Sequence, residues 1–109
     1  MMPLPHEVAL QKVLDTIKEV APHFKMPPLY MFQFMERRDR YGQASSDGEI
    51  RLSMLTLGEF DCKNKQFVNT IVHEVVHLNH WDDGHNANFK KINELIFRKV
   101  WNKLNEKEE

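Results

Sequence analysis

The chain has 109 residues and a mass of 13.0 kDa, which is enough for one small domain with a single core. Its 15 basic and 16 acidic side chains give a net charge of −1, which argues against a protein devoted to non-specific nucleic-acid binding. No apolar run approaches the roughly 20 residues of a membrane span, and the first residues lack the pattern of a signal peptide. The single cysteine, Cys62, cannot form an internal disulfide and predicts a reducing compartment. We therefore expect a cytoplasmic protein with no membrane association.

The N-terminal segment predicts an amphipathic helix. Pro5 suits the first turn of a helix, where the missing N–H of proline costs little, and Pro22 ends the helical pattern. Between them, apolar residues recur three or four positions apart: Leu10, Val13, Leu14, Ile17 and Val20. This spacing predicts that one face of the helix is buried.

The middle of the chain predicts a small sheet. Residues 29–35 form an apolar, aromatic-rich run, which predicts an interior strand because both of its faces are apolar. Residues 40–44 and 50–53 flank the turn-forming pair Asp47-Gly48, and they predict the two arms of a polar hairpin.

The second half of the chain predicts two more helices. The first is expected from about Lys65 to Trp81, because Asn64 is a good N-cap and residues 82–84, Asp-Asp-Gly, stop the pattern. Six apolar residues predict its buried face: Phe67, Val68, Ile71, Val72, Val75 and Val76. The last helix is expected after Asn86, and its apolar stripe consists of Phe89, Ile92, Ile96, Val100 and Leu104.

The order of these elements predicts an α+β fold with a helix, a sheet of two or three strands, and two helices. We expect a single domain over residues 1–109, ordered from about residue 5 to residue 105, with a frayed polar tail at residues 106–109. Histidine is unevenly distributed in this chain, because four of the six histidines lie between His73 and His85. The function should be sought in that stretch.

Residues 73–77, His-Glu-Val-Val-His, form an HExxH motif. On a helix, residues four positions apart lie on one face about one turn apart, so His73 and His77 can bind the same metal ion. At roughly 100° per residue, Glu74 falls on the side of these histidines, and Val72 and Val75 fall on the other. The motif therefore predicts a metal site on a helix with one face in the core and one face toward a cleft.

The chemistry of zinc gives this motif a function. Two imidazoles and a third protein ligand leave one coordination position for water, which is the arrangement of a catalytic site. Zinc lowers the pKa of that water towards about 7, so Glu74 can take its proton as general base and deliver it later to a leaving amine. The ion also polarises the substrate carbonyl group and supports the oxyanion. We therefore expect a Zn²⁺-dependent enzyme that hydrolyses amides, above all peptide bonds.

Two segments carry a family resemblance. Residues 73–89, HEVVHLNHWDDGHNANF, resemble the active-site region of the SprT-like zinc metallopeptidases, which include the Spartan protease domain. The pattern of that family is HExxH, a variable loop, and a histidine with an aromatic residue four positions later. Residues 42–53, GQASSDGEIRLS, resemble the hairpin that enters the active-site sheet of the family. The resemblance covers about residues 5–105 and implies a small zincin-like α+β domain.

The resemblance also implies roles for individual residues. His73, His77 and His85 would be zinc ligands, and Glu74 would be the catalytic acid and base. Many family members carry a four-cysteine zinc ribbon or DNA-binding extensions that this sequence lacks, so it resembles a minimal catalytic domain of the kind that phages and mobile elements carry. Since some members cut proteins crosslinked to DNA, the resemblance implies DNA-associated proteins as a substrate class.

The residues themselves leave three candidates for the third metal ligand, His80, Asp83 and His85. His80 shares the helix of the first two ligands, so it is expected to line the site rather than to bind the ion. Asp83 occupies the third-ligand position of the HExxHxxGxxH class, but that class has a glycine where this chain has His80. Gly84 favours a turn that brings His85 back over the end of the helix, which favours His85.

The sequence thus predicts a zinc-dependent endopeptidase acting on protein or peptide substrates. An extended substrate is expected to add as a strand along the backbone edge of residues 49–54. The alternative is a non-catalytic metal-containing binding protein, for example a phage factor that engages a host protein or nucleic acid. The presence of Glu74 argues against this alternative, because a structural metal ion needs no general base beside it. The sequence does not indicate an oligomeric state.

Overall fold

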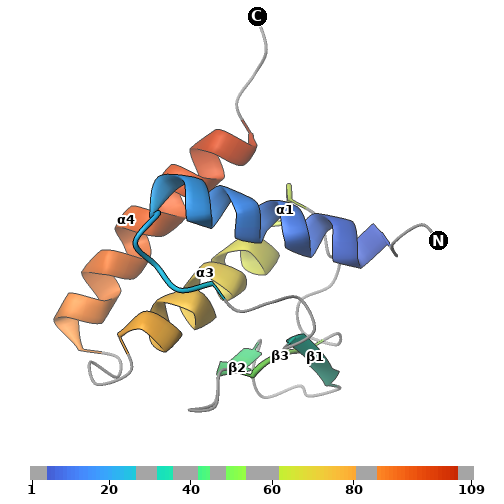
Figure 1. The fold of residues 1–109 in the computed structure, drawn as a ribbon, viewed down its shortest axis with the longest axis horizontal. Helices are drawn as coiled ribbons and strands as arrows, with labels where there is room; N and C mark the ends of the chain where they lie inside the picture. The colour runs from blue at the N-terminus through green and yellow to red at the C-terminus, as the bar shows by residue number, and fades with distance from the viewer. Residues whose placement is uncertain are drawn as a thin grey trace, which may run out of the picture.

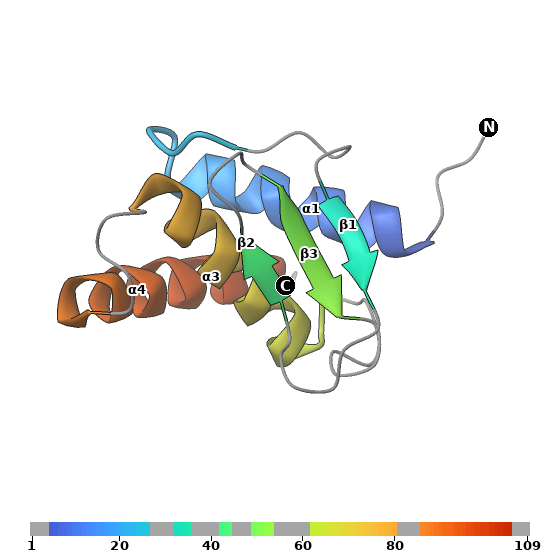
Figure 2. The same ribbon diagram turned by 90° about the horizontal axis from the view of Figure 1, so that it is seen from below.

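In the part of the chain that the structure describes, three helices lie on one face of a three-stranded sheet (Figures 1 and 2). The computed structural model describes residues 5–26, 32–35, 42–44, 49–53, 62–80 and 86–105. The elements follow in the order α1 (Pro5–Val20), β1 (Phe32–Met35), β2 (Gly42–Ala44), β3 (Ile50–Ser53), α3 (Lys65–Asn79) and α4 (Ala87–Leu104). This order confirms the predicted α+β class.

The sheet is mixed, and its strands lie in the order β1-β3-β2. Strand β1 runs parallel to β3, with Phe32 opposite Ile50, and β2 runs antiparallel to β3, with Gly42 opposite Leu52. The antiparallel pair confirms the predicted hairpin, although its turn lies outside the described residues. The prediction of an interior strand at residues 29–35 is wrong for the described residues, Phe32–Met35, because β1 pairs there with β3 alone.

Strand β3 is the interior strand, and this position overturns the predicted substrate edge. Residues 50–53 have a strand on each side, so their backbone hydrogen-bonding groups are already directed at β1 and β2. An added strand cannot pair there, and the expectation for the edge of residues 49–54 is therefore wrong. Ile50 and Leu52 are fully buried between the sheet and the helices, as their alternation predicted.

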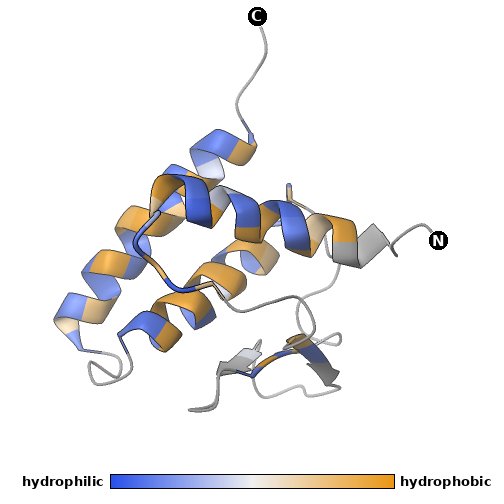
Figure 3. Ribbon diagram, in the orientation of Figure 1, coloured by the Kyte–Doolittle hydropathy of each residue, from blue (hydrophilic) through white to orange (hydrophobic). Residues whose placement is uncertain are grey.

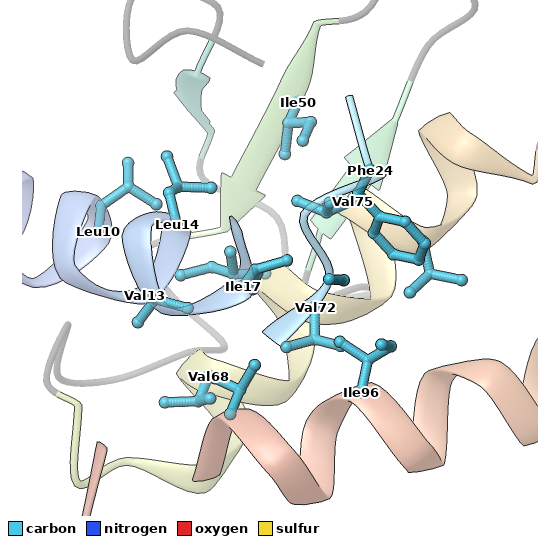
Figure 4. Close-up of a cluster of buried hydrophobic side chains, with 14 of the residues drawn as sticks. Leu10, Val13, Leu14, Ile17, Phe24, Ile50, Val68, Val72, Val75 and Ile96 are labelled. Atoms are coloured by element: carbon cyan, nitrogen blue, oxygen red, sulfur yellow. The ribbon is translucent and has the colours of Figure 1, made fainter. Parts of the chain in front are cut away.

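The core lies between the helices and the sheet. The helices carry apolar and polar stripes along their length (Figure 3), and the apolar side of α3 contributes all six residues that its spacing predicted. Figure 4 shows side chains from three helices converging there, with Ile17 of α1, Val72 of α3 and Ile96 of α4 among them. Helix α3 thus contacts the core over most of its circumference. This packing determines which side of the helix is left outside the core.

The ends of α3 are set by capping. The side chain of Asn64 accepts a hydrogen bond from the backbone N–H of Gln66 at 3.1 Å, which confirms the predicted N-cap. The helix ends at Asn79, earlier than the predicted Trp81, which lies outside the described residues. His80 is the C-cap and leaves the helical conformation, while its backbone N–H still donates to the carbonyl of Val76 at 2.8 Å.

Helix α4 closes the core against α1 and α3. It starts where predicted, because the side chain of Asn86 accepts a hydrogen bond from the backbone N–H of Phe89 at 2.9 Å. Its stripe residues Phe89, Ile96 and Val100 are buried. None of the helices in the described segments combines the length and the hydropathy that crossing a membrane would require.

Candidate metal site

The HExxH residues form a compact cluster on α3. One ligand atom from each of His73, Glu74 and His77 can be chosen so that all three lie within 4.8 Å of one another. The two imidazole rings lie one helical turn apart, with their centroids separated by 4.8 Å and their planes nearly perpendicular. This arrangement brings together the three residues that the motif predicted for a shared site.

The side of the cluster toward α4 is formed by Phe89. Its ring centroid lies 5.0 Å from that of His73 and 4.5 Å from that of His77, and only 2% of the residue is exposed. Because Asn86 caps the helix three residues earlier, the first turn of α4 holds this ring in place. Phe89 therefore limits the positions that both imidazoles can take, which reduces the entropy lost when they bind an ion.

The side of the cluster toward the sheet is formed by β2. Strand β2 packs against α3, and Gly42 lies beside Thr70 and the carboxyl group of Glu74. Thr70 and Glu74 are one helical turn apart, so they face the strand together. The cluster thus lies between a buried aromatic ring on one side and a strand backbone on the other.

Glu74 is the buried acid of the cluster. Only 4% of the residue is exposed, whereas His73 and His77 are half-buried. Removal of the carboxylate from water raises the pKa of Glu74 from its ordinary value of 4.5 to about 7. Without a cation nearby, this carboxyl group therefore exchanges its proton near neutral pH, where a general acid and base is most effective.

The donor set fits a divalent transition metal. Zinc holds imidazole nitrogens at about 2.0–2.1 Å, so two imidazoles that share an ion have their ligating atoms within about 4 Å. The bound of 4.8 Å for the three atoms of this cluster is close to that requirement. Two imidazoles with a carboxyl group beside them are typical ligands and neighbours of zinc.

The other predicted residues fall into two groups. Asp83 and His85 lie outside the described residues, so the choice between them stays a prediction. His80 is described, and it does not belong to the cluster of His73, Glu74 and His77. Its ring lies against Phe24, at a centroid distance of 5.9 Å, and His80 has left the helical conformation after the end of α3 at Asn79. A role for His80 in lining the site, without binding the ion, therefore stays a prediction.

Two residues near the site were not predicted from the sequence. Gly42 was assigned only to a hairpin arm, although a glycine inside a strand often marks the close approach of another group. Thr70 gave no signal, because a threonine on a helix is common and its role depends on which strand packs over it.

Comparison of the chain with protein-family models, with curated proteins and with solved structures finds no match.

Proposed function

We propose that this protein is a zinc-dependent endopeptidase of the SprT-like type, with a zincin-like fold. The single observation that carries the proposal is the cluster on α3, where His73 and His77 lie beside a buried Glu74 whose pKa is about 7. A purely structural metal site would not need a buried, desolvated carboxyl group next to its ligands. The sequence pattern of residues 73–89 supports the same assignment.

The proposed ligands are His73, His77 and His85. His73 and His77 would bind through imidazole nitrogens, and Phe89 would keep their rings in place. His85 is the preferred third ligand, because Gly84 directly before it permits a sharp turn after the helix. When bound, zinc supplies Lewis acidity, which lowers the pKa of water and polarises a carbonyl group.

The proposed role of Glu74 is proton transfer. A carboxylate oxygen of Glu74 takes a proton from the attacking water, and the same group then gives that proton to the nitrogen of the departing amine. The products are a carboxylic acid and an amine, so one water molecule is consumed for each peptide bond. Burial of Glu74 excludes bulk water from one side of this proton path.

The test is metal content and peptide hydrolysis in one preparation, with Glu74→Gln as the decisive variant. We expect about one zinc per chain in both proteins, and a loss of hydrolysis of about 10²–10⁴-fold in Glu74→Gln, because the imidazoles remain but the base is lost. Glu94→Gln is the matched control, since Glu94 is exposed on α4. Casein and a protein crosslinked to single-stranded DNA serve as substrates, and free single-stranded DNA as a candidate activator.

The outcomes separate the proposal from its alternative. Zinc binding without hydrolysis of any of these substrates by the wild-type protein would favour the non-catalytic binding protein. Near wild-type hydrolysis by Glu74→Gln, or loss of its zinc, would show that Glu74 is not the general base. Enhancement of hydrolysis by DNA would support DNA-associated proteins as the substrate class.

A further inference from the structure

Gly42 occupies the point where the backbone of β2 comes closest to the HExxH helix. A Cβ atom at this position would lie 2.9 Å from Cγ2 of Thr70, 3.1 Å from the backbone oxygen of Arg51 and 3.1 Å from Oε2 of Glu74. Ordinary van der Waals contacts of a Cβ begin at about 3.4 Å. The volume that a side chain would need is therefore already occupied, in part by the carboxyl group of Glu74.

The glycine is not explained by backbone conformation. Residue 42 has no φ between +20° and +160°, the region where glycine has its advantage over other residues. It lies in a regular antiparallel pair with Leu52, a setting in which glycine is disfavoured because it has no side chain to pack. The remaining reason for a glycine is the close approach of Thr70 and Glu74 from α3.

We propose that Gly42 is a positioning residue for Glu74. The strand backbone would act as a wall against which the carboxyl group lies, and the missing side chain would set the distance between β2 and Oε2. This inference rests on the proposed function, because it assigns to Gly42 the placement of the general base. A methyl group at residue 42 must displace the side chain of Thr70, the carboxyl group of Glu74 or the strand itself.

The first part of the test compares wild type with Gly42→Ala in the zinc-loaded protein. We expect kcat for peptide hydrolysis to fall roughly tenfold, since proton transfer depends steeply on the position of the base. KM and the Kd for zinc should stay within about twofold, because the three atoms nearest to the added methyl group belong to Thr70, Arg51 and Glu74 and not to a histidine. A packing defect alone would lower the unfolding midpoint and leave kcat of the folded protein unchanged.

The second part is a double-mutant cycle that needs no activity. The shift of the urea midpoint caused by Gly42→Ala is measured in the wild-type and Glu74→Ala backgrounds of the metal-free protein. The contact with the backbone oxygen of Arg51 is the same in both, so the difference reports on residues 42 and 74. We expect a smaller shift in Glu74→Ala. The same cycle in the Thr70→Ser background, which lacks Cγ2, measures how much of the midpoint shift comes from the contact with Thr70.

Each outcome decides one question. An unchanged kcat in Gly42→Ala, or an equal midpoint shift in the two backgrounds, would overturn the positioning role. Restoration of kcat together with stability in Gly42→Ala/Thr70→Ser would do the same, because Thr70 packing would then account for the whole effect. A wild-type protein without zinc-dependent hydrolysis would overturn the proposed function, while the cycle would still decide whether Gly42 accommodates Glu74.

Discussion

Glu74 is the residue in which the requirements of stability and of the proposed chemistry oppose each other. A buried carboxyl group without a cation is more stable in its protonated form, since desolvation penalises the charge. A general base must instead be ionised. A divalent cation held by the neighbouring histidines would restore the ionised form, because an opposite charge within a few ångströms lowers the pKa of a carboxyl group. The acid and the proposed metal ligands would thus be coupled through charge.

The first prediction follows from the pKa of Glu74 in the metal-free protein. This pKa is about 7 in the folded protein and 4.5 when unperturbed, so the folded state binds more protons between these values. The stabilisation from the protonated carboxyl group is complete below pH 4.5 and lost as the pH rises through 7, and it amounts to about 3 kcal/mol. Urea unfolding with a chelator, from about pH 4.5 to 7.5, measures it.

Comparison with Glu74→Gln isolates the contribution of Glu74. The glutamine side chain cannot ionise, so this variant should not show the loss of stability between pH 4.5 and pH 7. Glu94→Gln should behave as wild type, because Glu94 is exposed on α4. Histidines also titrate in this range, so only the difference between proteins is informative. Parallel pH profiles for wild type and Glu74→Gln would contradict the raised pKa.

The second prediction concerns the third ligand. We expect His85→Ala to lose zinc on dialysis, while Asp83→Ala and His80→Ala retain it. The position of His80 at the end of α3, with its ring against Phe24, gives an added reason to expect no loss there. Metal analysis of the three variants measures this directly. Full zinc occupancy in His85→Ala, with loss in one of the others, would reassign the ligand.

At the level of elements, local patterns predicted the helices well. The cap Asn64 and the apolar stripes are local in sequence, and α3 and α4 both begin where the sequence predicts. Helix α3 ends two residues before the predicted Trp81, because His80 already leaves the helical conformation ahead of the stop signal Asp-Asp-Gly at residues 82–84.

Strand order could not be predicted in the same way. An apolar run shows that both faces of a strand are covered, but it does not show which strands lie beside it in the sheet. Strand β1 therefore appeared interior, although β3 takes that place. The same limit applies to Gly42, because its contact with Glu74 joins residues 32 positions apart and depends on how the sheet packs on α3.

The third prediction moves the substrate edge from β3 to β2. Among the described strands, β2 pairs with β3 alone, and its Gly42 lies beside Glu74. An extended peptide added to the outer edge of β2 would therefore pass next to the general base. Hydrogen exchange of Glu74→Gln with an intact peptide bound should slow at residues 42–44, with residues 8–20 of α1 as an unchanged reference. Unaltered exchange at residues 42–44 would exclude this edge.

At the level of the whole molecule, α3 is supported on several sides, and its HExxH residues lie between Phe89 of α4 and strand β2. Helix α1 and helix α4 both pack on α3, and β2 packs on it from the sheet. The site residues thus lie on a helix that both other described helices and strand β2 contact. Local unfolding of the site without loss of the core is accordingly unfavourable.

The fourth prediction is that zinc stabilises the whole domain. An ion that binds only the folded state contributes about 2.7 kcal/mol at 100 times its Kd, which corresponds to a rise in Tm of roughly 10 °C for a domain of this size. Thermal unfolding with zinc and with chelator measures the rise. His77→Ala should show little of it, and an equal rise in His77→Ala would place the bound ion elsewhere.

The packing of α1 against α4 has a consequence for synthesis of the protein. Helix α1 is made early and α4 late, yet each needs the other to cover its apolar stripe. A nascent chain that has not yet released α4 from the ribosome also lacks Phe89, the ring that contacts both His73 and His77. The HExxH motif and strand β2 on one side of it are therefore translated before Phe89, which forms the other side. In the proposed enzyme, the two imidazoles would thus be held in place only after α4 has left the ribosome.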